Sequence, residues 1–148
     1  MYRPEDRTAV VDLAPRLTVG VAPWRDPDGV ASAAHAWVVG SVDGHDAERN
    51  PVFVAVDDDG AVVGFVSVGS RSHWSGETDG YVGELAVTER VERRGIGSAL
   101  MDAAEEWGRK HGLSRLTLET GAANTVAREF YRSRGYRDED VRLSVELA

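Results

Sequence analysis

The segment RRGIG, residues 93–97, combines basic residues with glycines, a composition typical of a site that binds a negatively charged group. A helical pattern follows it, and the start of a helix already carries a partial positive charge of roughly +0.5. Each arginine there costs roughly 0.3–1 kcal/mol of helix stability unless a negative group offsets it. Free N–H groups, glycines and the helix dipole together favour a bound phosphate. Pairing of the arginines with Glu89 or Glu92 is the alternative interpretation.

Two common phosphate-binding loops fit this stretch poorly. A Walker A loop needs G-x-x-x-x-G-K-[ST], and the sequence contains no Gly-Lys dipeptide. A dinucleotide-binding loop needs G-x-G-x-x-G, and Leu100 stands where the third glycine belongs. A nucleotide-binding protein therefore remains only as a weaker alternative.

Glu84 is a carboxylate within an otherwise apolar strand pattern, where its neighbours on the same face are Val82 and Ala86. A carboxylate in such a place needs a partner, a water channel or a raised pKa. A group of this kind can accept a proton from an incoming amine, directly or through water. A structural ion pair with an arginine is the other possibility.

Three further residues are weaker candidates for contact with a substrate. Glu119 ends the segment LTLE and can orient a substrate, while His73 and Trp74 lie in a polar segment that can line a pocket. A His-Trp pair in a loop is more often ordinary surface. The four histidines lack zinc-like spacing and the chain has no cysteine, so we expect no metal site.

Apolar periodicity predicts the elements that position these groups. The first helix follows Asp6, and Pro15 leaves its end open. The second begins at Asp26-Pro27, and its apolar stripe comprises Val30, Ala33, Ala34, Trp37 and Val38. Two later helices are expected over 96–111 and 124–134.

Strands are expected on both sides of a turn at residues 57–60, and again over 81–87, 114–120 and 141–147. The polar segment 70–80 is predicted to be a loop. Helices between the late strands imply parallel pairing, whereas the hairpin is antiparallel. The pattern predicts a single α/β domain over residues 1–148, with a mixed sheet covered on both faces.

Composition narrows the classes of partner. The net charge is −8, which disfavours nucleic acid and anionic membranes and favours small cationic molecules. No apolar run approaches the roughly 18 residues of a membrane span, and residues 1–10 have no signal-peptide character. Together with the absence of cysteine, these features lead us to expect a cytoplasmic protein.

Two segments, LAVTERVERRGIGSALM at 85–101 and NTVAREFYRSRGY at 124–136, resemble the GNAT superfamily of acyl-CoA-dependent N-acyltransferases. The order and spacing agree over about residues 52–146. The resemblance implies a central twisted mixed sheet of about six strands flanked by about four helices. Only residues 1–3 can supply the family's first strand, so we expect that strand to be short or missing.

The resemblance also implies acetyl-CoA as co-substrate and assigns roles to individual residues. Backbone groups of 85–87 would hold the pantetheine arm, and the 93–98 loop would hold the pyrophosphate. Tyr131 would be the general acid and Glu84 the general base. The implied cofactor contacts are Leu85, Ala86, Val87, Arg93, Arg94, Gly95, Ile96, Gly97, Ser98, Asn124 and Tyr131.

One position departs from the family pattern, because Glu92 stands where the family usually keeps Gln or Arg. We expect acetyl transfer to a primary amine by direct attack, since no cysteine is available for an acyl-enzyme. The acidic chain favours a small cationic amine, such as an aminoglycoside-like compound or a polyamine. Alternatives are a protein N-terminus or lysine as acceptor, and a CoA-binding module without turnover. A homodimer is expected from the resemblance.

Overall fold

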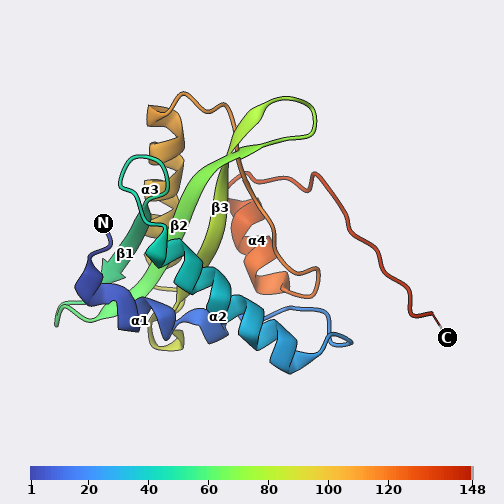
Figure 1. Cartoon of the computed structure of the whole chain (residues 1–148), viewed down its shortest axis with the longest axis horizontal. Coiled ribbons are helices and arrows are strands. Elements are labelled where there is room, and N and C mark those ends of the chain that lie inside the picture. The colour runs from blue at the N-terminus through green and yellow to red at the C-terminus, as the bar shows by residue number, and fades with distance from the viewer. Residues whose placement is uncertain (148) are drawn as a thin grey trace.

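A four-stranded mixed sheet in the order β1-β2-β3-β4 runs through the molecule in the computed structural model, which describes residues 1–147 (Figure 1). The strands are β1 (Val52–Val56), β2 (Val62–Ser72), β3 (Thr78–Val87) and β4 (Leu116–Leu118). The first three strands pair antiparallel, and β4 pairs parallel to β3. The predicted hairpin and the predicted mixed pairing are therefore confirmed.

Helices cover both faces of this sheet (Figure 1). The α-helices are α1 (Arg7–Val11), α2 (Pro27–Asp43), α3 (Ile96–Lys110) and α4 (Thr125–Ser133). Short 3-10 turns are η1 (Pro4–Asp6), η2 (Ala14–Thr18) and η3 (Glu89–Val91). Asp26 caps α2 by accepting a hydrogen bond from the Gly29 N–H at 2.8 Å, as the sequence predicts.

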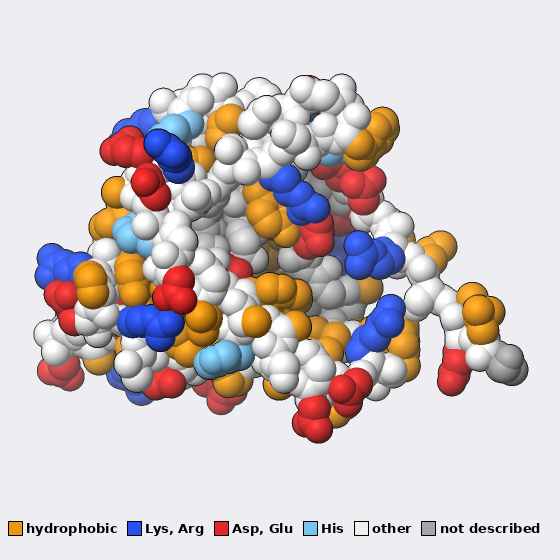
Figure 2. Space-filling view, in the orientation of Figure 1, with side chains coloured by type: hydrophobic (Ala, Val, Ile, Leu, Met, Phe, Trp, Pro, Cys, Tyr) orange, Lys and Arg blue, Asp and Glu red, His pale blue; other side chains and the backbone are white. Residues whose placement is uncertain are grey.

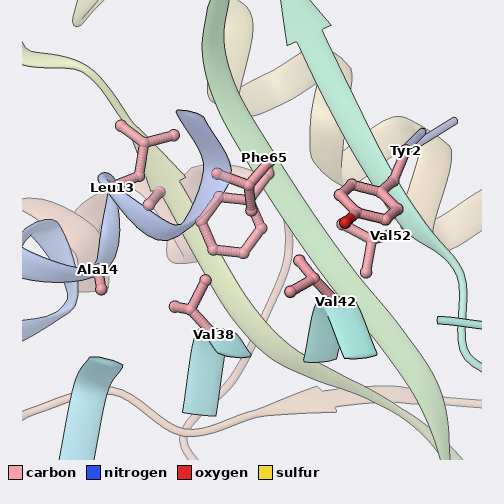
Figure 3. Packing of buried hydrophobic residues seen from close by; sticks show 9 residues of the cluster. Tyr2, Leu13, Ala14, Val38, Val42, Val52 and Phe65 are labelled. Atoms are coloured by element: carbon pink, nitrogen blue, oxygen red, sulfur yellow. The ribbon is translucent and has the colours of Figure 1, made fainter. Parts of the chain in front are cut away.

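Side chains alternate between two cores along the central strands. Phe65 and Ala86, which pair across β2 and β3, belong to a core with Val38 and Val42 of α2 (Figure 3). Val66, the next residue of β2, belongs to a second core with residues of α3. The sheet therefore separates an α2 side from an α3 side.

The predicted first helix is broken into shorter pieces. Residues of α1 form one helical turn, and η2 begins beside Pro15. Proline has no N–H to donate to a preceding carbonyl, which disfavours a continuous helix at this point. Val10, Leu13 and Ala14 are nevertheless buried, as their spacing predicts.

The predicted loop at 70–80 is wrong over most of its length. β2 continues to Ser72 and β3 starts at Thr78, and these two residues pair across the hairpin. Only the residues between them turn. The segment is polar because this end of the hairpin projects beyond the helices that cover the rest of the sheet (Figure 1).

The predicted sheet of about six strands has four within residues 1–147. At the N-terminus, the Tyr2 N–H donates to the Val52 carbonyl at 2.8 Å without forming a strand, which confirms that the first strand is short or missing. The predicted last strand at 141–147 is wrong for this chain alone. Residues 137–147 lead away from the body and have no strand beside them (Figure 1).

Candidate active site

A cavity of about 500 Å³ lies between α2 and the sheet. The face drawn in Figure 2 is hollowed near its centre, between α2 and the β2-β3 hairpin of Figure 1. Glu84 is the only charged side chain among its lining residues. The lining residues are Ala36, Trp37, Gly40, Ser41, Gly44, Asn50, Val52, Ser67, Val68, Gly69, Ser70, Tyr81, Gly83 and Glu84.

Glu84 is buried at this cavity, with 8% of its surface exposed. Its Oε2 accepts a hydrogen bond from Ser41 Oγ at 2.8 Å and another from Ser67 Oγ. Burial raises the pKa of Glu84, and the two hydroxyl donors partly oppose that rise. Within residues 1–147 no arginine or lysine pairs with it, so the ion-pair interpretation of Glu84 is wrong.

A bulge in β3, where Gly83 and Glu84 stand opposite Ser67 alone, holds Glu84 against Ser67. The β2-β3 register shifts between Val66 and Val68, and the Glu84 N–H donates to Ser67 Oγ at 2.9 Å. Gly83 permits this approach, since a Cβ there would lie 2.7 Å from Ser67 Oγ. Bulges often re-aim a side chain beside a functional site. Ser67 therefore fixes both the backbone and the carboxylate of Glu84.

Helix α2 forms the opposite wall of the cavity with Trp37 and Ser41. The sequence places Trp37 in the apolar stripe of this helix, but its side chain is 60% exposed. The buried stripe instead consists of Ala34, Val38 and Val42. Trp37 lies one helical turn before Ser41, so both reach the cavity rather than the core.

The edge of β3 that faces β4 is open over residues 83–87. β4 pairs only with Gly80, Tyr81 and Val82, and no other strand of residues 1–147 takes the remaining edge. Backbone groups on an open edge can bind an extended ligand. This segment includes Leu85, Ala86 and Val87.

Tyr131 of α4 packs against the core on the α3 side. Burial raises its pKa to about 12, so the phenol keeps its proton at neutral pH. Its ring lies 5.7 Å from that of Tyr136, centroid to centroid, in an edge-to-face arrangement. Glu84 shares the opposite sheet face with Ala86. The opening between β3 and β4 thus lies between a sheet face that carries a buried carboxylate and a sheet face that carries a protonated phenol.

The loop between β3 and α3 has the backbone of an anion site. Gly95 has φ +81° and Arg93 has φ +62°, both in the left-handed region. The first hydrogen bond of α3 runs from the Ala99 N–H to the Gly95 carbonyl at 3.0 Å. The N–H groups of Ile96, Gly97 and Ser98 therefore precede the helical ladder and are available to a ligand.

Arg16 neutralises the acids of this loop. Its Nη1 lies 2.7 Å from Glu89 Oε1, and its Nη2 pairs with Glu92. Its Nε also donates to the Val87 carbonyl at 3.2 Å. Arg93 and Arg94 have no carboxylate partner within residues 1–147, so their predicted alternative pairing with Glu89 or Glu92 is wrong.

Comparison with known proteins decides the family. A model described as the acetyltransferase (GNAT) family matches residues 18–136, which is more than half of the chain. The chain belongs to the GNAT family. It is therefore an enzyme, an N-acetyltransferase, as the resemblance implies.

Relatives of this GNAT acetyltransferase cover nearly the whole chain. An aminoglycoside N(6')-acetyltransferase type 1 of Klebsiella aerogenes is 27% identical over 93% of this chain and 90% of its own length. A putative acetyl transferase from Pyrococcus furiosus has a TM-score of 0.77 at 20% identity, with 97% and 95% of the two chains covered. AAC(6')-Iy in complex with the bisubstrate analogue CoA-S-monomethyl-acetylneamine has a TM-score of 0.65 at 18% identity, with 98% and 94% covered.

Both polar atoms of the Asn124 side chain form hydrogen bonds within the chain. Its Oδ1 accepts from the Ala127 N–H at 3.1 Å, which caps α4. Its Nδ2 donates to the Val19 carbonyl at 3.3 Å. The cap predicted from the sequence is confirmed, and contact with a cofactor stays a prediction.

The structure does not bring the remaining substrate candidates to the cavity. His73 and Trp74 lie at the tip of the hairpin, and Trp74 is 87% exposed. Thr78, beside that tip, is about 20 Å along β3 from Glu84 at roughly 3.3 Å per residue. Glu119 is exposed and pairs with Arg71 at 3.0 Å.

Two general properties complete the description of residues 1–147. They contain no group of three or more histidine, aspartate or glutamate side chains placed to hold a metal ion. Every helix in this part of the chain is too short or too polar to span a lipid bilayer.

The sequence analysis did not identify Arg16, Ser41 and Ser67 as residues of the candidate site. Ser67 leaves a weak signal, because it is a single hydroxyl within the apolar run FVSV of β2. Arg16 and Ser41 leave none, because each meets its partner only through the fold.

Proposed function

We propose that this acetyltransferase moves the acetyl group of acetyl-CoA to a primary amine on a small cationic molecule by direct attack. The observation that carries the proposal is Glu84, a buried carboxylate that has no cationic partner within residues 1–147, on the wall of a cavity beside the open edge of β3. Such a group can both attract an ammonium ion and accept its proton.

Acetyl-CoA fits two features of the chain. The open edge at Leu85, Ala86 and Val87 offers backbone groups to the pantetheine arm, apart from the Val87 carbonyl that already accepts from Arg16 Nε. The N–H groups at the start of α3, together with Arg93 and Arg94, offer positive charge to the pyrophosphate. The relative solved with a CoA-containing bisubstrate analogue supports this assignment.

The chemistry needs a proton acceptor for the amine and a proton donor for the leaving thiolate, and the chain has one group for each role. The ammonium acceptor loses a proton to Glu84, directly or through water, and its nitrogen lone pair then attacks the thioester carbonyl carbon. A C–N bond forms, the C–S bond breaks, and the Tyr131 hydroxyl protonates the leaving sulfur. The acylated nitrogen then gives its extra proton to the Tyr131 phenolate through solvent, which leaves a neutral amide and restores the acid. A backbone N–H on the open edge of β3 stabilises the negative charge that develops on the carbonyl oxygen.

The acceptor class follows from the charge and size of the cavity. Its single charged lining residue is an acid, and the whole chain has a net charge of −8. Two relatives carry aminoglycoside 6'-acetylation in their names, which supports a small cationic amine. We therefore place aminoglycoside-like compounds and polyamines ahead of peptide amines.

A binding test followed by a turnover test examines the proposal. We expect acetyl-CoA to raise the melting temperature and ATP and NAD to leave it unchanged. We then expect thiol release from acetyl-CoA with at least one aminoglycoside or polyamine, and little with lysine-containing peptides. Stabilisation without thiol release on any amine would indicate a binding module, and absence of stabilisation by acetyl-CoA would refute the proposal.

The Arg16 contacts predict that replacing Arg16 weakens acetyl-CoA binding and leaves the rate of the chemical step nearly unchanged. Arg16→Gln leaves Glu89 and Glu92 unneutralised beside the pyrophosphate, so the KM for acetyl-CoA should rise about 5- to 30-fold with kcat nearly unchanged. Steady-state kinetics at low salt measures this. Arg90→Gln is the control, because Arg90 pairs with Asp57 at 2.9 Å instead. An unchanged KM in the Arg16 variant would contradict the role of this residue.

Ser41 predicts a shift in the pH profile. Its hydrogen bond favours the ionised form of Glu84, so Ser41→Ala should raise the pKa of Glu84 further. The acidic limb of kcat/KM should move to higher pH, and activity below neutral pH should fall by about tenfold. Ser70→Ala, at another lining position of the cavity, is the matched control. If both variants keep the wild-type profile, Ser41 does not position the base.

A further inference from the structure

Trp37 of α2 lies where two cavities meet. It lines the cavity that contains Glu84 and also a second cavity of about 390 Å³. The residue is 60% exposed, so much of its indole ring is left uncovered by the rest of residues 1–147. Apolar side chains border the hollow in Figure 2. An open aromatic ring between two cavities is a typical contact for a ligand that extends over both.

The second cavity is apolar apart from one pair of opposite charges. Leu17 of η2 and Val21 line it together with Val30 of α2. Its charged lining residues, Arg25 and Asp26, are neighbours of opposite sign, and the others are apolar or glycine. A second ammonium group therefore gains no net attraction there, and hydroxyl groups would lose hydrogen bonds to water without replacing them. An uncharged hydrocarbon segment suits this lining best.

The surface of α2 connects the two cavities. Ser41, which donates to Glu84, lies one turn after Trp37, about 6 Å along the helix axis at 1.5 Å per residue. Val30, in the second cavity, lies about 10 Å from Trp37 in the opposite direction on the same scale. Gly40 leaves the helix surface open between Trp37 and Ser41, because a Cβ there would meet nothing within 4 Å. A chain that starts at Glu84 can therefore pass over Trp37 and continue beside Val30.

We infer that the acceptor is a linear primary amine whose hydrocarbon stem runs from Glu84 over Trp37 into the second cavity. The inference rests on the proposed function, because it takes Glu84 as the partner of the reacting ammonium group. Members of the polyamine class with long methylene stems fit this path. Aminoglycoside rings, which carry several hydroxyl and ammonium groups, fit its apolar lining less well. Trp37 is then the residue that selects for the length of the stem.

Calorimetric titration with methylamine, butylamine, hexylamine and octylamine tests the stem separately from acetyl transfer. Each methylene that leaves water should lower the Kd about two- to fourfold, so octylamine should bind about 16- to 250-fold more tightly than butylamine. Trp37→Ala should weaken octylamine binding about tenfold or more and leave methylamine binding unchanged. Trp37→Phe keeps an aromatic ring and should retain most of the gain. Trp24→Ala is the matched control, since Trp24 is 70% exposed and lines neither cavity.

Three outcomes of these titrations would overturn the inference. They are a Kd that does not depend on stem length, a length dependence that persists in Trp37→Ala, and equal weakening of methylamine and octylamine, which would show that Trp37 holds the ammonium group instead of the stem. Thiol release from acetyl-CoA with the same amines separates the inference from the proposed function. Turnover without length dependence would keep the proposed function and remove the inference. Length-dependent binding without turnover on any amine would support the stem site and refute acetyl transfer.

Discussion

Replacing Tyr131 with phenylalanine should lower kcat by about 10²- to 10⁴-fold, the usual contribution of a general acid. The variant lacks only the hydroxyl, so packing against the α3-side core and the ring contact with Tyr136 should persist. Burial raises the pKa of Tyr131 to about 12, so the wild-type phenol is protonated at neutral pH and can supply the leaving sulfur. The KM for acetyl-CoA should change much less than kcat.

Tyr136→Phe is the matched control for this experiment. Tyr136 lies beside Tyr131, and burial also raises its pKa, but its hydroxyl donates to Glu105 at 3.3 Å rather than remaining free. We expect this variant to keep kcat and to lose some thermal stability. A Tyr131 variant that turns over as fast as the Tyr136 variant would remove Tyr131 from the mechanism.

Replacing Glu84 with glutamine should lower kcat/KM by about 100-fold and abolish the acidic limb of its pH profile. The base must be ionised to accept a proton, so wild-type activity should rise with pH through a pKa above the usual carboxyl range. Glutamine has nearly the same shape and can still accept hydrogen bonds from Ser41 and Ser67. The loss should therefore come from the missing charge and proton acceptor.

The stability of the Glu84→Gln variant has an expected sign. Burial raises the pKa of Glu84 in the folded state, so ionisation lowers stability as pH rises through the interval between the unfolded and folded pKa values. Glutamine has no such penalty, so its melting temperature at neutral pH should equal or exceed that of the wild type. Glu119→Gln, an exposed carboxylate already paired with Arg71, is the kinetic control. A pH profile unchanged in the Glu84 variant would show that another group is the base.

Local pattern was sufficient to predict the backbone features to which we assign cofactor binding. The glycine-rich loop, the start of α3 and the Asn124 cap are short segments whose backbone geometry depends mainly on nearby residues. The position of Glu84 in an apolar strand also predicted a buried carboxylate. Each of these features can be recognised without knowing which distant segments meet it.

Contacts between distant segments could not be predicted in this way. Arg16 reaches Glu92 across 76 positions of the chain, and Ser41 reaches Glu84 across 43. Trp37 was misplaced for a related reason, because helical spacing cannot separate a core-facing position from the adjacent one at a cavity. Arg16 neutralises acidic side chains, Ser41 positions Glu84, and Trp37 lines the cavity. Each of these roles depends on contacts that form only in the assembled fold.

The predicted strand at 141–147 failed for a different reason. The alternation at 141–147 was correctly recognised, but a strand also needs a partner edge, and none lies beside it in one copy of the chain. Periodicity therefore identifies a segment that is able to pair, but a strand forms only where a partner edge lies beside it.

Amine-dependent release of CoA thiol from acetyl-CoA, with mass analysis of the acceptor, tests the central proposal most directly. We predict thiol release and an N-acetylated product with an aminoglycoside or polyamine, lost in parallel when Glu84 or Tyr131 is replaced as above. The same product formed at the wild-type rate by both variants would contradict the account of a base and an acid that meet at the opening between β3 and β4.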